Sequence, residues 1–166
     1  MVFFLPSIGQ NTIAIGRAMK MNVLVYDPFP KADSEGVKYV SLEELLKNSD
    51  FVSLHCPLMD STRHLINAET LKIMKPTAFI INTARGPLID EAALIEALKN
   101  GTIAGAGLDV QEVEPLAASS PLFAMDNVVL TPHMGWKGLE SRQRLVGILK
   151  EAIDGYRKGE KVHRVD

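Results

Sequence analysis

The sequence predicts an α/β fold in which parallel strands alternate with helices. Short apolar runs recur along the whole chain, helical patterns separate them, and the runs lack strict alternation of polar and apolar residues. Strands that are buried on both faces of a parallel sheet have this near-continuous apolar pattern. Because a strand–helix–strand order favours right-handed crossovers within one sheet, we expect a doubly wound parallel sheet and a single domain over residues 1–166.

The expected strands are the runs richest in valine, isoleucine and phenylalanine. They cover residues 2–5, 22–27, 51–56, 78–84, 103–110 and 127–132. No internal repeat, low-complexity segment or linker interrupts them, which supports one domain.

Local signals mark the ends of the helices between these strands. Ser41 and Glu44 have the spacing of a capping box, and Asn67 and Asp90 are typical N-cap residues. Gly101 can end a helix in the left-handed conformation. The last helix is expected over about residues 136–158, with an apolar stripe formed by Leu145, Leu149, Ala152 and Tyr156.

Composition and charge exclude several classes of protein. The 166 residues are 46% apolar and 23% charged, and the formal net charge is −2. These values exclude intrinsic disorder and leave no basic face for nucleic acid. No apolar run approaches the roughly 18 residues of a membrane span, and the lone Cys56 excludes a disulfide framework and a thiolate metal site. Since the apolar start also lacks the basic region of a secretory signal, we expect a soluble, cytoplasmic protein without a metal.

Polar side chains follow the ends of the predicted strands, where open α/β sheets bind their ligands. These residues are Asp27, Cys56, Thr83, Arg85, Asp109, Glu112, Glu114 and His133. An arginine can bind a carboxylate through two parallel hydrogen bonds, and a histidine can exchange a proton with a carbonyl oxygen. A carboxylate beside the histidine fixes its tautomer. Such a trio suits reduction of a 2-keto acid, with the hydride supplied by a nicotinamide.

Successive stretches of the chain resemble the NAD-dependent D-isomer-specific 2-hydroxyacid dehydrogenases. The stretches are IGQNTIAIGRAMKMNVLVYDP, LHCPLMDSTRHLINAETLKIMKP, INTARGPLIDEAALIEAL, GAGLDVQEVEP and TPHMGW. They occur in the family's order and at its spacing. With Trp136, the stretch PHMGW most resembles the glycerate dehydrogenase and hydroxypyruvate reductase branch of the family. The resemblance implies a Rossmann-type NAD-binding domain. It also implies hydride transfer between NAD(H) and a small D-2-hydroxy acid or 2-keto acid, such as glyoxylate or hydroxypyruvate.

The same resemblance implies roles for individual residues. Arg85 would bind the substrate carboxylate and polarise its carbonyl, His133 would be the acid and base, and Glu114 would pair with His133. Asp27 would accept hydrogen bonds from the adenosine ribose and so favour NAD(H) over NADP(H). The other cofactor positions are Ser7, Ile8 and Gly9 at a helix N-terminus, and Cys56, Thr83, Asp109, His133 and Gly135 around the nicotinamide and its ribose.

One departure from the family pattern lies in the dinucleotide loop. The six positions of G-x-G-x-x-G are here residues 4–9, and only the third glycine, Gly9, is present. Phe4 is bulky and Pro6 has no N–H to donate to a phosphate, so we expect weakened binding of NAD. Replacing both residues by glycine is expected to strengthen NADH binding by about tenfold or more.

The other departure is larger. The family's substrate domain precedes its NAD-binding domain and is absent here, so we expect truncation at the N-terminal side within the first strand. A frameshift, a split gene or a wrong start site would explain residues 1–6. The chain is then expected to be incomplete as a stand-alone enzyme, with the substrate domain supplied by a separate polypeptide or with the chain in a homo-oligomer. A non-catalytic module that senses NAD or binds a partner is the alternative.

Several polar residues and glycines are expected to be structural. We expect His55 to be packed or hydrogen-bonded and His64 and His163 to be solvated, and we expect Glu112 to be a solvated neighbour of the catalytic carboxylate. Cys56 is expected to be a buried apolar side chain without a redox role. Gly105 and Gly107 lie within a predicted strand and indicate close packing instead of a phosphate loop.

Overall fold

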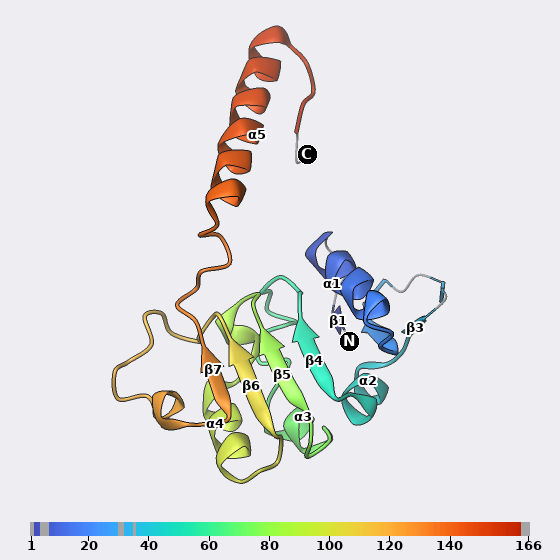
Figure 1. Ribbon diagram of the computed structural model, residues 1–166, viewed down its shortest axis with the longest axis vertical. Coiled ribbons are helices and arrows are strands. Elements are labelled where there is room, and N and C mark those ends of the chain that lie inside the picture. The colour runs from blue at the N-terminus through green and yellow to red at the C-terminus, as the bar shows by residue number, and fades with distance from the viewer. Residues whose placement is uncertain (1, 4–6, 30–31, 35, 164–166) are drawn as a thin grey trace. The chain divides into compact units, whose positions relative to one another are not determined.

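The computed structural model describes residues 2–3, 7–29, 32–34 and 36–163 (Figure 1). The chain divides into two compact units, Met1–Pro132 and His133–Asp166. The first unit carries the sheet and most of the helices, and the second carries the last helix. The two loop residues Phe4 and Pro6, on which the prediction of weakened NAD binding depends, lie outside the described residues.

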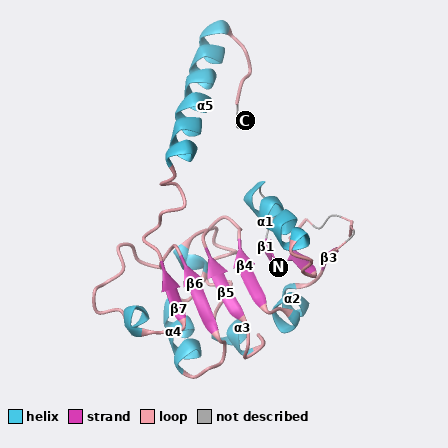
Figure 2. Cartoon of the chain, in the orientation of Figure 1, coloured by secondary structure: helices cyan, strands magenta, loops and turns pink. Residues whose placement is uncertain are grey.

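The first unit is built on a parallel sheet, which in the described residues has seven strands in the order β3-β2-β1-β4-β5-β6-β7. Figure 2 shows β4, β5, β6 and β7 side by side. The strands are β1 (Val2–Phe3), β2 (Val23–Tyr26), β3 (Val37–Tyr39), β4 (Phe51–Leu54), β5 (Phe79–Asn82), β6 (Gly105–Leu108) and β7 (Val128–Leu130). The chain order reverses between β1 and β4, so the doubly wound parallel sheet is confirmed. Strand β3 was not predicted, because three residues at a sheet edge are too few to show a pattern.

Helices α1 (Ser7–Ala18), α2 (Leu42–Asn48), α3 (Ala68–Lys72) and α4 (Glu91–Lys99) connect the strands, with two short 3₁₀ helices, η1 (Gly86–Leu88) and η2 (Pro121–Ala124). Right-handed crossovers on either side of β1 place α1 on one face of the sheet and α3 and α4 on the other. Buried residues follow this division. Val23, Val25 and Val37 pack with Ile13 of α1, whereas the larger cluster joins β4, β5 and β6 to α2, α3 and α4.

The predicted caps are present in three helices. Ser41 accepts a hydrogen bond from the Glu44 amide at 3.1 Å, and Asp90 accepts one from the Ala93 amide at 3.0 Å. Asn67 caps α3, and Thr70, three residues farther along, completes a capping box there. The Glu44 side chain binds Lys38 at 3.1 Å.

Two glycines of β6 allow neighbouring segments of the same chain to approach closely, as predicted. A Cβ atom on Gly105 would lie 2.6 Å from the Asn127 carbonyl oxygen and 2.7 Å from the Phe79 ring. A Cβ atom on Gly107 would lie 3.1 Å from Ile81. These contacts explain why a central strand contains residues that otherwise weaken strands.

The second unit consists mainly of α5 (Leu139–Lys158). The helix begins later than the predicted Trp136, because Gly138 is its N-cap, and it ends where Gly159 adopts the left-handed conformation at φ +77°. Most of the predicted stripe is exposed: 67% of Leu145, 57% of Leu149 and 86% of Tyr156. None of the helices in the described part of the chain has the length and apolar character needed to cross a membrane.

Candidate functional site

The predicted site residues of the first unit follow strand ends at one edge of the sheet. Asp27 follows β2, Cys56 follows β4, and Thr83 and Arg85 follow β5. Asp109 follows β6, and Glu114 lies five residues farther along the same loop. Because all these strands are parallel, their carboxyl ends share one edge, which is where open α/β sheets bind ligands.

Asn82, at the end of β5, shapes the loop that carries Arg85. Its side-chain amide donates to the Arg85 carbonyl oxygen at 2.9 Å, and its side-chain oxygen accepts from the Ala84 amide at 3.1 Å. Asn82 is 1% exposed, so the loop is fixed from inside the protein. Arg85 itself is exposed and donates to the Ala84 carbonyl oxygen at 2.7 Å. The guanidinium therefore stands at the surface, where it can reach a carboxylate.

The loop after β6 carries two predicted carboxylates in different environments. Asp109 is buried and accepts a hydrogen bond from the Thr131 hydroxyl, which ties the ends of β6 and β7 together. Glu114 is exposed, and its Oε1 accepts from the Gln111 amide at 3.0 Å. The peptide bond between Glu114 and Pro115 is cis.

The loop that carries Arg85 (the arginine loop) and the loop that carries Asp109 and Glu114 (the acidic loop) contact each other through their backbones. A Cβ atom on Gly86 would lie 1.7 Å from the Gln111 carbonyl oxygen and 2.6 Å from the Glu112 nitrogen. No other residue fits there without a backbone shift. The residue after Arg85 thus touches a residue three positions before Glu114, which brings the two loops together. Sequence reasoning did not single out Gly86, although its place directly after the arginine was a signal.

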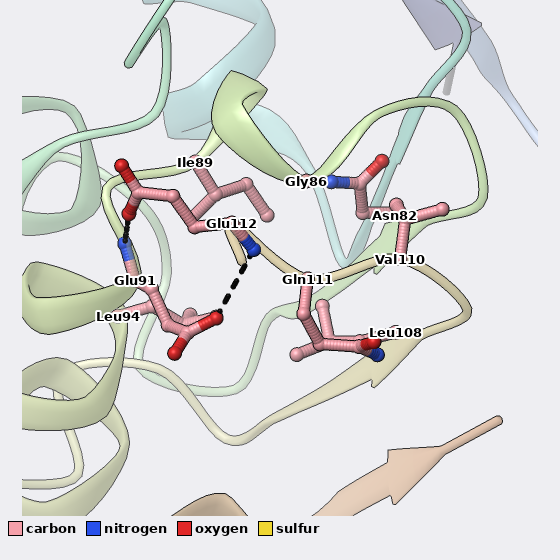
Figure 3. Close-up of a pocket in the computed structure, with 9 residues that line it drawn as sticks. All are labelled: Asn82, Gly86, Ile89, Glu91, Leu94, Leu108, Val110, Gln111 and Glu112. Carbon is pink, nitrogen blue, oxygen red and sulfur yellow. Dashed lines mark hydrogen bonds between the residues drawn. The ribbon is translucent and has the colours of Figure 1, made fainter. Parts of the chain in front are cut away.

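Glu112 and His64 are not the solvated residues that the sequence indicated. The His64 Nε2 atom lies 2.7 Å from Glu112 Oε1, and 37% of the His64 and 28% of the Glu112 side chain is exposed. Glu112 Oε2 also accepts from the Glu91 amide at 3.1 Å, and Glu91 Oε2 accepts from the Glu112 amide at 3.2 Å (Figure 3). The two glutamates therefore join the acidic loop to the first turn of α4.

The environments of His55 and His163, two other histidines that were expected to be structural, agree better with the prediction. His55 is 9% exposed and lies 2.9 Å from the Ser53 hydroxyl, and burial lowers its pKa below the usual value. His163 is exposed and lies 2.9 Å from Glu151. Neither stands among the residues predicted to bind cofactor or substrate.

The predicted cofactor residues have contrasting environments. Asp27 is half-buried, and its Oδ1 accepts from the Phe29 amide at 2.8 Å. Thr83 is exposed, whereas Cys56 is 2% exposed and burial raises its pKa to about 11, so it is a protonated thiol near neutral pH. Gly9 is buried in the first turn of α1, beside the exposed Ile8. Among the described residues, no three histidine, cysteine or acidic side chains are placed to hold a metal ion.

The second unit begins with His133, and Gly135 follows it. His133 is exposed and has a positive φ of 48°. Trp136 lies 5.7 Å from the Arg142 guanidinium carbon, a cation–π distance. The position of this unit relative to the first is not determined, so the pairing of His133 with Glu114 stays a prediction.

Comparison with protein families gives a match over residues 5–135. The matching model is described as the D-isomer specific 2-hydroxyacid dehydrogenase, NAD binding domain. The match covers β2 to β7 and all the predicted site residues of the first unit.

Individual proteins match over nearly the whole chain but over only part of their own length. A hydroxypyruvate reductase of Blautia hydrogenotrophica is 42% identical over 161 residues, which are 96% of this chain and 50% of that protein. A glyoxylate reductase of Pyrococcus furiosus is 46% identical, over 92% of this chain and 46% of its own. A D-lactate dehydrogenase of Lactobacillus jensenii, solved with NAD⁺, has a TM-score of 0.91 at 33% identity and covers 99% of this chain and 54% of its own. The chain thus spans about half the length of these relatives.

Proposed function

Because the chain belongs to the D-isomer specific 2-hydroxyacid dehydrogenase family through its NAD-binding domain, we propose that it forms the cofactor side of a 2-keto acid reductase. The reaction is hydride transfer between NAD(H) and a small D-2-hydroxy acid or 2-keto acid. Glyoxylate and hydroxypyruvate are the proposed substrates, since relatives that are 42% to 46% identical carry the names glyoxylate reductase and hydroxypyruvate reductase.

The observation that carries this proposal is the backbone contact between Gly86 and Gln111. It holds an exposed arginine, Arg85, in a loop that touches the loop of an exposed carboxylate, Glu114. A 2-keto acid needs both groups: a cation for its carboxylate, and a carboxylate that fixes the proton-donating histidine. A buried or distant arginine would not serve this chemistry.

The residues of the first unit also fit a dinucleotide. Helix α1 begins at Ser7, after β1, so its first amides can face a pyrophosphate. Asp27 follows the next strand, β2, 18 residues after Gly9, which suits a ribose contact. We propose that Ser7, Ile8, Gly9 and Asp27 hold the adenosine half, and that Cys56, Thr83, Asp109, His133 and Gly135 surround the nicotinamide half.

In the proposed mechanism, Arg85 binds the keto acid carboxylate through two hydrogen bonds and polarises the neighbouring carbonyl. His133 donates a proton to the carbonyl oxygen as it becomes a hydroxyl, and takes the proton back in the reverse reaction. Glu114 accepts the other ring N–H of His133 and so fixes its tautomer. A bound nicotinamide would supply the hydride that reaches the carbonyl carbon.

A binding module without catalysis is the second candidate, and the exposed apolar stripe of α5 favours it. Such a module would sense NAD or bind a protein partner. In the enzyme proposal, a separate substrate-domain polypeptide or a homo-oligomer completes the site around the exposed Arg85 and Glu114. Either protein would work in the cytoplasm, where Cys56, a buried free thiol, stays reduced.

Titration with NADH tests the cofactor part of the proposal. We expect saturable binding, and we expect Asp27→Ala to weaken it by about tenfold or more, because a charged hydrogen bond to the ribose is lost. Asp33→Ala is the matched control, since Asp33 is an exposed aspartate whose Oδ1 binds the Tyr39 amide. We expect NADPH to bind more weakly than NADH, and equal binding of the two would contradict the role of Asp27.

A turnover assay separates the two candidates. With glyoxylate or hydroxypyruvate, we expect little NADH oxidation by these 166 residues alone. We expect a clear increase when a substrate domain of a related reductase is fused to the chain or added to it. His133→Ala should abolish that increase. Binding of NADH without turnover in the fused protein would favour the sensing module, and turnover of roughly 1–1000 per second by the chain alone would show that it is a complete enzyme.

A further inference from the structure

We infer that Glu112 is a positioning residue that fixes the loop of Glu114, and that it does so by joining this loop to His64 and to the first turn of α4. The inference rests on the proposed function, because it assigns the orientation of the proposed catalytic carboxylate to a neighbour that contacts no substrate. The Glu112 side chain reaches from the acidic loop to both groups, as Figure 3 shows for its bond to Glu91.

The contacts around Glu112 are reciprocal and specific. One carboxylate oxygen meets His64 Nε2 at 2.7 Å, and the other accepts from the Glu91 amide at 3.1 Å. The backbone amide of Glu112 is held in turn by the Glu91 carboxylate at 3.2 Å. A residue bound through both its side chain and its amide has little freedom to rotate, so the backbone around Glu112 is fixed.

The partners of Glu112 are themselves fixed by the chain. The His64 amide donates to the Pro87 carbonyl oxygen at 2.9 Å, so the histidine is tied to the arginine loop. Glu91 is the first residue of α4, which Asp90 caps. A carboxylate at this helix end is favoured by the helix dipole as well as by the amide. Glu112 therefore connects three segments that are far apart in sequence.

Gln111 links the backbone of Glu112 to the side chain of Glu114. The Gln111 amide donates to Glu114 Oε1 at 3.0 Å, and the Gln111 carbonyl oxygen lies against Gly86. Since Gln111 precedes Glu112 directly, the fixed backbone of Glu112 sets the direction of the Gln111 amide. The cavity that Gln111 and Glu112 line together with Asn82, Gly86 and Glu91 holds only about 10 Å³, which is close to the minimum for one water molecule.

Amide hydrogen exchange, followed residue by residue by NMR on the full chain, tests the inference without any need for activity. In Glu112→Ala we expect the Gln111 amide to exchange about tenfold faster or more, because its bond to Glu114 is no longer aligned. In Glu112→Gln the side-chain oxygen can still accept from the Glu91 amide, so we expect the Gln111 amide to return close to its original rate. Glu96→Ala is the matched control, since Glu96 is an exposed glutamate of α4 that pairs only locally with Lys99 at 3.2 Å.

The Glu114 carboxyl signal gives a second readout. We expect its carbon chemical shift to move in Glu112→Ala and to be restored in Glu112→Gln. Faster exchange at Glu91 and Glu112 alone, with Gln111 and the Glu114 signal unchanged, would overturn the inference. Equal loss of protection throughout residues 1–132 in both variants would also overturn it, because Glu112 would then be a stability element only. NADH binding plays no part in these measurements, so their failure is distinct from failure of the proposed function.

Discussion

Leucines of the two units have opposite environments, although both lie on amphipathic helices. Leu71 and Leu94, on α3 and α4 of the first unit, are 1% exposed. Leu145 and Leu149, on α5 of the second unit, are 67% and 57% exposed. Helices α3 and α4 thus bury their leucines in the core of the first unit, whereas the leucines of α5 are largely exposed.

The difference shows that an apolar stripe predicts a contact but not the partner. In α4 the stripe meets β5 and β6, which the same unit supplies. The α5 stripe has the same spacing, and its leucines are exposed in the structure of this chain. Each Å² of apolar surface that α3 and α4 bury contributes about 25 cal/mol to the free energy of folding.

Truncating one leucine in each unit is the strongest test of this contrast. We expect Leu94→Ala to lower the free energy of unfolding by about 2–5 kcal/mol, because it leaves a cavity in a packed core. We expect Leu149→Ala to change it by less than about 0.5 kcal/mol, as for an exposed site. Urea unfolding followed by circular dichroism measures both. Similar losses in the two variants would show that α5 is packed in solution.

The buried thiol of the first unit sharpens the contrast through pH. Burial raises the pKa of Cys56 from 9.0 to about 11, so the folded protein keeps a proton that the unfolded chain releases. Stability is therefore expected to fall as pH rises from about 9 to about 11, by up to about 1.4 kcal/mol per pH unit. Other groups titrate in this range, so the measurement is the difference in slope between the unchanged chain and Cys56→Ala. Parallel slopes would show that Cys56 is accessible to solvent.

Substitutions of two glycines are expected to have effects of opposite sign in the two units. We expect Gly86→Ala to destabilise the first unit by about 1–3 kcal/mol, because the new methyl group meets the Gln111 carbonyl oxygen. A Cβ atom on Gly147 meets nothing within 4 Å, so Gly147→Ala is expected to stabilise α5 by about 0.5–1 kcal/mol. Thermal unfolding gives the first value, and the helix signal in circular dichroism gives the second. A neutral Gly86→Ala would mean that the two loops separate easily.

The helix caps give the smallest expected difference. Asp90 caps α4, whereas the N-cap of α5 is Gly138, which has no side chain to accept a hydrogen bond. We expect Asp90→Ala to cost about 1 kcal/mol, and Gly138→Asp to add a few tenths of a kcal/mol to the stability of α5. Gly138 has φ −54° and ψ 130°, which other residues also adopt. Loss of helix signal in Gly138→Asp would contradict this expectation.

The sequence was most informative where the cause of a structure is local. Buried strands appear as apolar runs, and the caps at Ser41, Asn67 and Asp90 depend on residues three or fewer positions apart. The order of polar residues at strand ends was predictable too, because parallel topology brings those ends to one edge. Strand β3 lacked such a signal, since its three residues owe their conformation to pairing with β2.

The contacts that shape the candidate site are not local, and they were missed. His64 and Glu112 are 48 residues apart in the sequence, and no helix or strand periodicity relates two positions at that distance. The approach of Gly86 to Gln111 joins loops from two different strands. Polar residues in loops look solvated in a sequence, because nothing in their neighbourhood shows which distant backbone will lie beside them.

The absence of a side chain at residue 86 bears on how active sites are recognised from sets of variants. Every missense change of that codon places at least one carbon in the space of the Gln111 carbonyl group. A mutational scan would therefore show substitutions to be unfavourable at residue 86 as well as at Arg85, its neighbour. The intolerance of the glycine would report steric exclusion, whereas that of the arginine would report chemistry. Separating the two requires measuring folding and ligand binding for each variant independently.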